Sequence, residues 1–532
     1  MRLLAIHTMG HDTGLALFED ARLLFAVETE RVTRVRHDHR VESALDHAWQ
    51  ATGLGPSDID LLVFSTNLRK DFARIDEYDA IGEAIEGGQL HAEGHSTLLG
   101  GSKRCLVVAH EASHAALACH HGNWTDRTLV LVNEGHGSFS RNSCFVHDRG
   151  ALTLVDHDAL PWYGTGFGWT LLAFLAGFGR SPSAAGTLMA LGGYGSYSAE
   201  AEGALLGVSR NIHLERRAAQ EQQLQPLFAY VERHSEFTER ANLIRTFQEL
   251  FTNAVYDYCA RQMVDHGCTA LALSGGCALN LHANTAIRRG LCPTLAIPPN
   301  CNDSGQALGA AVYALEFCLG IRPAPFSQYS CGVPIDVDAA RAAAGQAGLQ
   351  AEPADCARIV DALAGGAVVA LARGASELGP RALGNRSLLA STLVPGMRER
   401  VSARIKERQW FRPLGCVMRT ERFTELFGDG PASPYMLFNY DMPAGLAPAA
   451  THADGTSRIQ TLDRDVNPML WEILAEYERR TGEPALINTS LNGPRLPIAY
   501  RSEDVVNDFL DREVDLFVFD DLIARRNGIR RS

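Results

Sequence analysis

Short apolar runs separated by small and polar residues open this chain. Leu3 to His7, Leu15 to Phe18 and Leu23 to Val27 are runs of this kind, and turn-forming residues lie between them, glycine-containing at 10–14 and acidic at 19–20. Apolar runs of about four to eight residues bounded by turn residues are typical of buried strands. The pattern therefore predicts three strands joined by short turns.

The same order of elements returns about 125 residues later. Thr128 to Val132 is apolar, a loop of small residues follows at 134–138, and further strands are predicted on either side of the turn at 148–150. A search for repeats thus predicts an internal duplication, with chance similarity as the alternative. Two such halves, each offering a glycine loop across a cleft, are typical of the actin and sugar-kinase class of α/β folds.

Two later loops place backbone N–H groups at the start of a helix, where anions bind. Leu271 to Ser274 predicts a strand that runs into the Gly275-Gly276 turn before a helix. Residues 302–305 are expected to cap an alanine-rich helix predicted from Gln306 to Leu315. Ordinary strand-to-helix turns explain either loop equally well.

A second α/β unit is predicted from about residue 354 to the end of the sequence. Strands are expected at Val368 to Ala372, near Leu486 and at Leu516 to Phe519, and residues 337–353 are expected to form a connecting helix. We therefore expect one domain over residues 1–345 and a second over residues 354–532.

Composition and charge narrow the function classes. Apolar residues make up 46% and charged residues 21% of the 532, as in ordinary globular proteins. The net charge of −13 argues against nucleic acid or an anionic membrane as partner. Because the N-terminus turns polar early and no apolar run approaches the ~20 residues of a membrane helix, we expect a cytoplasmic protein. Twelve cysteines without Cys-x-x-Cys spacing predict buried thiols.

His110-Glu111-Ala112-Ser113-His114 predicts a metal site, because residues four apart share one helix face. Glu134 and Asp303 are candidate carboxylate ligands, and a set of two histidines with carboxylates suits Fe(II) or another divalent metal. Satisfied core histidines are one alternative. The string also matches the His-Glu-x-x-His pattern of zinc peptidases.

His11, in the first glycine-containing turn, is a candidate general base. The unperturbed pKa of histidine, about 6.5, suits proton transfer near neutral pH. A histidine that simply caps its own loop is the alternative.

Cationic and amide side chains gather in the C-terminal part of the sequence, including one of only three lysines. Arginine binds phosphate with two parallel hydrogen bonds and lysine adds a compact charge, so such a group favours a small polyanionic ligand over a solvated basic surface. The group comprises Arg381, Lys406, Arg412 and Arg458, with Asn488, Ser490 and Asn492 close to it.

Taken together, these motifs resemble the NodU/CmcH-type O-carbamoyltransferase family. The string Gly-Pro-Arg-Ala-Leu-Gly-Asn-Arg-Ser at 379–387 is the most specific of them. Further matching segments follow the family's order along nearly the whole chain: 10–12, 28–34, 110–114, 188–195, 274–280, 303–305 and 488–492.

The resemblance implies an N-terminal domain of the actin and sugar-kinase type and a YrdC-like C-terminal domain. It implies that the C-terminal domain forms carbamoyl-adenylate from carbamoyl phosphate and ATP, with Mg²⁺ accompanying ATP. The N-terminal domain then transfers the carbamoyl group to a hydroxyl of a secondary metabolite, as in antibiotic biosynthesis, at an iron-dependent site. Whether the chain forms a homodimer is left open.

The resemblance also implies roles for single residues. His11 resembles the base that deprotonates the acceptor. The residues that resemble metal ligands are His110, His114, Glu134 and Asp303. The residues that resemble carbamoyl phosphate and ATP ligands are Arg381, Lys406, Arg412, Arg458 and Ser490, with Asn488 and Asn492 nearby. The residues expected to bind the adenylate in the N-terminal domain are Asp12, Gly275, Gly276, Asn280 and Asn302.

Three departures from the family pattern keep other functions open. Glu134 stands where the family has an aspartate ligand, residues 185–187 replace a Glu-Gly-Lys triplet, and Arg495 to Ile498 replaces Gly-Glu-Pro-Ile. The alternatives are a metallopeptidase built on the His-Glu-x-x-His string and a nucleotide-binding scaffold whose transfer site has decayed.

Overall fold

The computed structural model of the protein describes residues 1–8, 12–66, 73–123, 126–179, 184–215, 217–326, 329–428, 432–510 and 512–526. These residues divide into two compact units, and neither unit is one continuous stretch of chain. The first unit contains residues 1–6, 20–22 and 59–325. The second contains residues 7–19, 23–58 and 326–532. The domain boundaries expected from the sequence stay a prediction, but the second unit takes in N-terminal segments that the sequence pattern did not assign to it.

In the first unit, β1 (Arg2–His7), β4 (Leu61–Ser65), β6 (Lys103–Val108) and β5 (His91–Ser96) are neighbours in that order. The first three run parallel and β5 is antiparallel to β6. Nearly every residue of β1, β4 and β6 is buried, as expected for parallel strands covered on both faces.

A second sheet in this unit has the order β10-β7-β8-β9. These strands span Ala270–Ser274, Thr128–Asn133, Asn142–Asp148 and Ala151–His157. β10 pairs in parallel with β7, as β4 does with β1, and two more strands follow each of β1 and β7 along the chain. The duplicated pattern predicted from the sequence is therefore confirmed.

Helix α5 (His110–Gly122) follows β6 after a single residue and is almost entirely buried. Helix α13 (Gln306–Tyr313) packs so closely on it that a Cβ atom at Gly309 would lie 2.1 Å from the carbonyl oxygen of Ser113. This close packing brings the turn before α13 near the start of α5.

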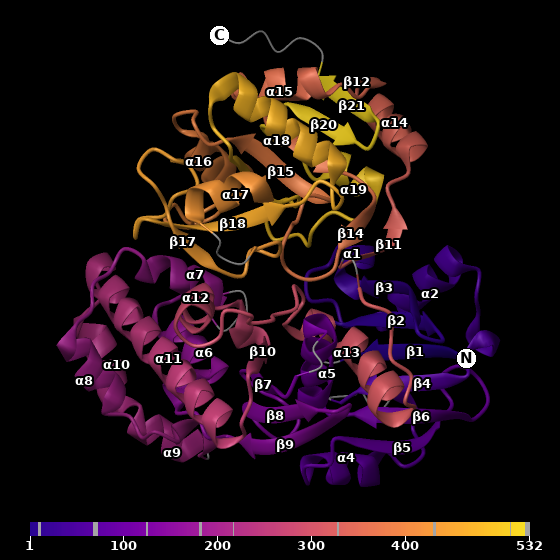
Figure 1. The fold of residues 1–532 in the computed structure, drawn as a ribbon, viewed down its shortest axis with the longest axis vertical. Coiled ribbons are helices and arrows are strands. Elements are labelled where there is room, and N and C mark those ends of the chain that lie inside the picture. Colours follow the sequence, from indigo (N-terminus) through magenta and orange to yellow (C-terminus); the bar gives the residue numbers. More distant parts are fainter. Residues whose placement is uncertain are drawn as a thin grey trace. The chain divides into compact units, whose positions relative to one another are not determined.

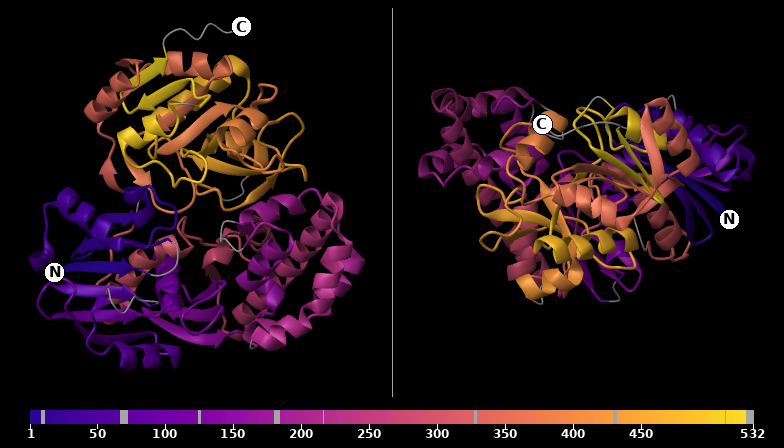
Figure 2. Two further views of the ribbon diagram at one scale, coloured as in Figure 1. Left: turned by 180° about the vertical axis from the view of Figure 1, so that it is seen from behind. Right: turned by 90° about the horizontal axis from the view of Figure 1, so that it is seen from above.

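Among the remaining helices of this unit, α4 packs on β5, and the 29-residue α11 packs against α7, α8 and α12. Both ribbon views show α8, α10 and α11 side by side (Figures 1 and 2). The bounds are α4 Tyr78–Glu86, α6 Gly166–Leu175, α7 Ala184–Gly192, α8 Ala199–Leu206, α9 Arg217–Gln223, α10 Gln225–Arg233, α11 Phe237–Asp265 and α12 Leu281–Gly290.

The second unit is built on a nine-stranded sheet with the order β12-β21-β20-β13-β15-β19-β16-β18-β17. These strands are β12 Leu349–Pro353, β13 Val368–Ala372, β15 Arg386–Ser391, β16 Gly415–Arg419, β17 Asn439–Asp441, β18 Thr456–Leu462, β19 Leu486–Ser490, β20 Leu516–Phe519 and β21 Leu522–Arg526. Other strands are the neighbours β2 (Gly14–Glu19) and β3 (Arg22–Glu28), and the pair β11 (Ser330–Pro334) and β14 (Ala375–Glu377). The helices are α1 Thr29–Thr33, α2 Val41–Thr52, α14 Val337–Gln346, α15 Cys356–Ala364, α16 Met397–Glu399, α17 Thr420–Phe427, α18 Pro468–Thr481 and α19 Ser502–Asn507.

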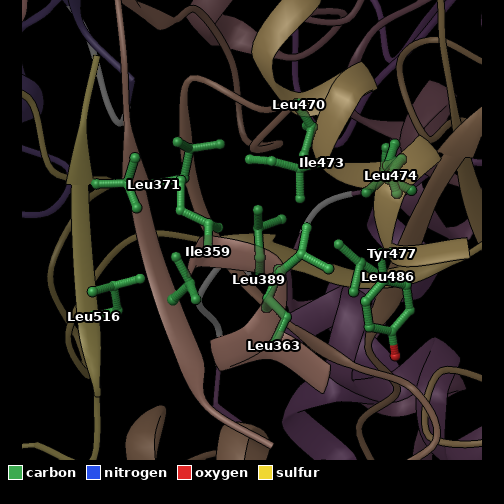
Figure 3. Close-up of a cluster of buried hydrophobic side chains, with 14 of the residues drawn as sticks. Ile359, Leu363, Leu371, Leu389, Leu470, Ile473, Leu474, Tyr477, Leu486 and Leu516 are labelled. Atoms are coloured by element: carbon green, nitrogen blue, oxygen red, sulfur yellow. The ribbon is translucent and has the colours of Figure 1, made fainter. Parts of the chain in front are cut away.

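The core of the second unit lies between this sheet and helices α15 and α18, which pack on each other (Figure 3). Leu363 of α15 and Leu474 of α18 are fully buried against Leu389 and Leu486 of the sheet. Tyr477 turns its hydroxyl to Ser391 Oγ, 2.6 Å away. The packing fixes β15 and β19, from which the residues of the second site described below extend.

Most predicted elements are confirmed, and the chain has the expected mixed α/β structure. The connecting helix over 337–353 is wrong in part, because α14 ends at Gln346 and β12 begins at Leu349 after a turn with Gly348 at φ 70°. Residues 302–305 form a short turn, and the residue before α13, Gly305, has no side chain to cap it.

Two predictions from composition can be compared with the structure. All twelve cysteines lie in the described ranges as free thiols, and none of them is exposed. Of the helices that are described, none has the length and apolar character needed to cross a membrane.

Candidate functional site

Four side chains that can bind a metal converge in the first unit. His110 and His114 lie one turn apart on α5, Glu134 directly follows β7, and Asp303 begins the turn before α13. One ligand atom from each of the four lies within 4.8 Å of the others. The structure thus brings together all four metal ligands predicted from the sequence.

The contacts in this metal-ligand cluster join imidazole nitrogens to carboxylate oxygens. His114 Nε2 lies 3.0 Å from Glu134 Oε1 and 3.3 Å from Asp303 Oδ1, and His110 Nε2 lies 3.3 Å from the same Asp303 oxygen. Burial opposes the charged form of His114, but hydrogen bonds with Asp303 and Glu134 outweigh it and raise the pKa of His114 to about 9. Two imidazoles and two carboxylates form a donor set that suits a divalent cation.

Neighbouring polar groups orient the two histidines. Ser274 Oγ lies 3.2 Å from His114 Nδ1, which leaves Nε2 directed at the carboxylates. The backbone N–H of His110 donates to Thr66 Oγ1 at 2.7 Å and Ser138 Oγ at 3.0 Å. The roles of Thr66 and Ser138 could not be found from the sequence, because no motif marks a hydroxyl that anchors a helix from another loop.

Glu111, the middle residue of the His-Glu-x-x-His string, does not belong to the metal-ligand cluster. Its Oε1 accepts hydrogen bonds from the backbone N–H groups of Phe139 (3.0 Å) and Ser140 (3.1 Å). A Cβ atom at Gly137 would lie 2.3 Å from the same oxygen. Glu111 therefore holds the loop after Glu134 in place and is not positioned as the general base of a peptidase.

The glycine turn after β10 adjoins the metal-ligand cluster. The N–H of Gly276 donates to Glu134 Oε1, and Gly275 has φ 90°. A Cβ atom at Gly275 would lie 2.4 Å from the carbonyl oxygen of Asn133, so only glycine fits. Glu134 therefore links the metal-ligand cluster to the turn that the sequence singled out for anion binding.

The other residues expected to bind the adenylate lie in different settings. Asn280 caps α12 through Ala283 N–H and exchanges two hydrogen bonds with Gln248, so both ends of its amide are in use. Asn302 Oδ1 accepts a hydrogen bond from Ser304 at 2.8 Å. Their role in adenylate binding stays a prediction.

Two of the predicted site residues, His11 and Asp12, lie in the first glycine-containing turn. His11 lies outside the described residues. Asp12, which is described, has φ 61° and belongs to the second unit, where its Oδ1 lies 3.4 Å from His37 Nδ1. The predicted roles of His11 and Asp12 stay predictions.

In the second unit, Lys406 is buried among acceptors from the end of β19 and the residues that follow it. Its Nζ donates to the carbonyl oxygen of Ser490 at 2.5 Å, to Ser490 Oγ at 3.1 Å and to Asn492 Oδ1. The structure therefore brings together three residues that the sequence assigned to one site. Asn488 also lies on β19. Its Nδ2 donates to Gln460 Oε1 at 2.7 Å and to the carbonyl oxygen of Ala382 at 3.3 Å.

Burial and charge repulsion lower the pKa of Lys406 and of several arginines in this part of the second unit. Burial, followed by Arg408 and Arg412, lowers the pKa of Lys406 well below its usual value. Burial and the charges of Arg381, Arg408 and Arg412 likewise lower the pKa of Arg458. We call Arg381, Lys406, Arg408, Arg412 and Arg458 the cation cluster.

Four of the five cations in the cation cluster have little compensating negative charge, although Asp508 acts on Lys406. Among the described residues, no salt bridge joins Lys406, Arg408, Arg412 or Arg458 to a carboxylate. The Nε atom of Arg458 is buried without a hydrogen-bond partner in that part of the chain. An anionic ligand with several oxygen acceptors would satisfy such donors and offset the repulsion between the cations.

Two cations near this site were missed in the sequence. Arg408 lies in the segment that carries Lys406 and Arg412, yet it was not singled out. Arg36 follows α1. Burial, together with the charges of Arg36 and other arginines, lowers the pKa of Arg412 to about 10 and that of Arg408 to about 9. No local pattern could have linked Arg36 to residues more than 370 positions away.

Comparison with known proteins gives a consistent family. A family model described as Carbamoyltransferase N-terminus matches residues 2–102 and 90–312, and one described as Carbamoyltransferase C-terminus matches residues 360–526. The 3'-hydroxymethylcephem-O-carbamoyltransferase of Streptomyces clavuligerus is 31% identical, over 97% of this chain and 98% of the relative. Nodulation protein U of Sinorhizobium fredii is 29% identical, over 91% and 92%.

A solved structure gives a weaker likeness. Full-length HypF in its phosphate- and nucleotide-bound form is 12% identical and aligns over 61% of this chain and 47% of HypF, with a TM-score of 0.38. A likeness at this level says nothing about a shared activity.

Proposed function

This chain belongs to the carbamoyltransferase family, and from that premise we propose that it is an ATP-dependent O-carbamoyltransferase that modifies a hydroxyl group of a small natural product. The observation that carries the proposal is the presence of two sites with different chemistry in one chain. The cation cluster is suited to phosphate groups, and the metal-ligand cluster is suited to a Lewis acid. An activation step and a transfer step need these two environments.

The first step would take place at the cation cluster. Carbamoyl phosphate and water give carbamate and phosphate, and carbamate then attacks the α-phosphorus of ATP to give carbamoyl-adenylate and pyrophosphate. Lys406, Arg381, Arg412 and Arg458 would bind the phosphate oxygens, assisted by Arg36 and Arg408, and would offset the negative charge that develops on them. Mg²⁺ would accompany ATP. Ser490 and Asn492 would hold the ammonium group of Lys406 in place.

The second step would take place at the metal-ligand cluster. Fe(II) or another divalent cation, held by His110, His114, Glu134 and Asp303, would supply Lewis-acid stabilisation of negative charge. His11 would accept the proton of the acceptor hydroxyl as its oxygen attacks the carbamoyl carbon, and AMP would leave. Asp12, Gly275, Gly276, Asn280 and Asn302 remain the proposed adenylate-binding residues.

The proposed division of labour follows the domains expected from the sequence. Residues 1–345 would carry out the transfer, and residues 354–532 would form the carbamoyl-adenylate. The N-terminal segment 23–58, which belongs to the second compact unit, would contribute to the adenylate-forming site.

Neither alternative function receives support from a specific observation. The peptidase hypothesis requires Glu111 to face the metal, whereas its oxygen binds the backbone of residues 139–140. The hypothesis of a decayed transfer site expects dispersed ligands, whereas four donor groups lie together.

The proposal can be tested by incubating the protein with carbamoyl phosphate, ATP and a panel of hydroxylated acceptors. We expect pyrophosphate and AMP, and loss of both with Lys406→Ala. His11→Asn should stop carbamoylation of the acceptor while pyrophosphate release continues, because the two steps use different sites. If the unmodified protein releases no pyrophosphate under any of these conditions, the proposed function is wrong.

A further inference from the structure

The loop that carries Arg381 is held on its downstream side by a buried carboxylate. This loop, residues 378–385, connects β14 to β15. Glu377 Oε1 accepts hydrogen bonds from the backbone N–H groups of Leu383 at 2.7 Å and Asn385 at 2.8 Å. Glu377 is 3% exposed, so these hydrogen bonds are protected from water. The second half of the loop therefore has one defined position.

The upstream side is held by two residues from the N-terminal part of the chain. The N–H of Gly379 donates to Glu28 Oε1 at 2.6 Å, and Arg31 Nη2 donates to the carbonyl oxygen of Gly379 at 2.7 Å. Glu28 and Arg31 also pair with each other, with an N–O distance of 3.2 Å. Figure 1 shows α1, which carries Arg31, beside the end of β14. We call this arrangement the Gly379 clamp.

The Glu28–Arg31 pair is deeply buried, and such burial does not by itself stabilise a fold. The side chains of Glu28 and Arg31 are 5% and 3% exposed. Burial raises the pKa of Glu28 to about 7, against the opposing effect of Arg31. Buried ion pairs can often be replaced by apolar side chains without loss of stability, because removing two charges from water is costly. The role of this pair therefore lies in the position that it gives to Gly379.

We propose that Glu28 and Arg31 are positioning residues that set the orientation of Arg381 toward its phosphate ligand. The inference rests on the proposed function of the cation cluster. Gly379 has φ 95°, which favours glycine, and Pro380 has its own φ fixed by its ring at about −65°. Only Pro380 separates Gly379 from Arg381, so the backbone position of Gly379 constrains where the arginine side chain begins. The adenylate-forming site would thus include a part from the N-terminal strand meander.

The test replaces the pair by apolar residues in the full-length protein, as Glu28→Met with Arg31→Met. No charge of the pair is left unpaired, so we expect the variant to fold, with a melting temperature lowered modestly because the Gly379 N–H and carbonyl lose their partners. Its Kd for carbamoyl phosphate, measured by calorimetry at pH 8, should rise on the order of 10-fold to 100-fold, the loss expected from a displacement of about 1 Å. Exchange of the Gly379 amide hydrogen with solvent should accelerate.

A thermodynamic cycle separates positioning from a general structural effect. In an Arg381→Ala background, the same double substitution should change the Kd less than threefold, since the group that it positions is absent. Replacing the Arg419–Glu478 pair, 2.7 Å apart in the same unit, by two methionines provides the control and should leave the Kd unchanged. This pair is less buried, and Glu478 also binds Arg422. Should the double variant fail to fold, Glu28→Gln with Arg31→Gln leaves neither charge of the pair, keeps an acceptor and a donor near Gly379, and should weaken binding by a smaller factor.

Several outcomes would overturn the inference. These are an unchanged Kd in the folded double variant, an equal loss in the Arg381→Ala background, and an equal loss in the Arg419–Glu478 control. Because the measurement is binding and not turnover, it decides on the Gly379 clamp even if no pyrophosphate is formed. Absence of pyrophosphate alone would count against the proposed function.

Discussion

Replacing Asp303 by asparagine should separate the two proposed chemistries. Asp303 Oδ1 lies 3.3 Å from the Nε2 atoms of both His110 and His114, so one carboxylate oxygen lies close to both imidazoles. Loss of a partner outside the ligand set typically weakens metal binding about 10-fold to 100-fold, so loss of a ligand charge should weaken it at least about 100-fold. Pyrophosphate release at the cation cluster should continue, whereas transfer to a hydroxyl acceptor should stop.

The effect on stability can be worked out from mass action. With a divalent metal at about 1,000 times the Kd of the unmodified protein, binding stabilises the fold by about 4.1 kcal/mol. A 100-fold weaker Asp303→Asn variant at the same concentration is stabilised by about 1.4 kcal/mol. Anaerobic melting curves with and without Fe(II), together with the metal content after dialysis, measure the difference of about 2.7 kcal/mol.

Glu111→Gln is the matched control, because Glu111 lies on the same helix as the two histidines but faces the backbone of residues 139–140. A glutamine keeps the acceptor oxygen and removes the charge, so metal affinity should stay within about threefold of the unmodified protein. The reasoning would be refuted if Asp303→Asn bound the metal as tightly as the unmodified protein, or if Glu111→Gln weakened binding more than Asp303→Asn did.

Three further predictions follow from burial and backbone geometry. His213 is 2% exposed, and burial together with Arg141 lowers its pKa to about 4. As the pH falls from 6.5 to 4, the unfolded chain binds more protons than the folded protein, so the free energy of unfolding should fall by up to about 3 kcal/mol. His213→Phe should reduce that loss in urea unfolding measured at a series of pH values. Gly275→Ala should destabilise the protein by more than about 2 kcal/mol, whereas Gly186→Ala in α7, with nothing within 4 Å of its new Cβ, should be neutral or stabilising in the same melts. Carbamoyl phosphate should raise the depressed pKa of Lys406, so calorimetry in buffers of different ionisation enthalpy should show proton uptake on binding, and proton release would contradict this.

The fold was largely predictable where local pattern and burial agree. Apolar runs such as Thr128 to Val132 became fully buried strands, because a parallel or central strand must be apolar on both faces. The connection over 337–353 failed for the opposite reason. Its alanine-rich first half forms α14, but Leu349 to Pro353 gains more from pairing with β21 than from continuing the helix. Helix propensity is a weak preference that such pairing outweighs.

The site was predictable where its residues share a motif. His110 and His114 lie four residues apart on one helix, so their convergence follows from helix geometry. Asp303 was a candidate ligand by residue type, but no local geometry linked it to the two histidines. The tight packing of α13 on α5 at Gly309 brings it to them. Thr66 and Ser138, which fix the first turn of α5, carry no motif and became visible only through their contacts with His110.

The N-terminal segment 28–34 shows why local sequence patterns could not predict which residues lie near the cation cluster. Glu28 and Arg34 were noted as part of one motif, but a charged run after a strand is also what a solvated turn looks like. Burial decides between the two: the Glu28 side chain is 5% exposed, and Arg34 donates to the Ile498 carbonyl at 2.7 Å and to Asp508 at 2.5 Å. Charges removed from water need partners, and these partners lie hundreds of residues away in the chain. The motif therefore belongs to the second compact unit, in which residues 23–58 lie with residues 326–532.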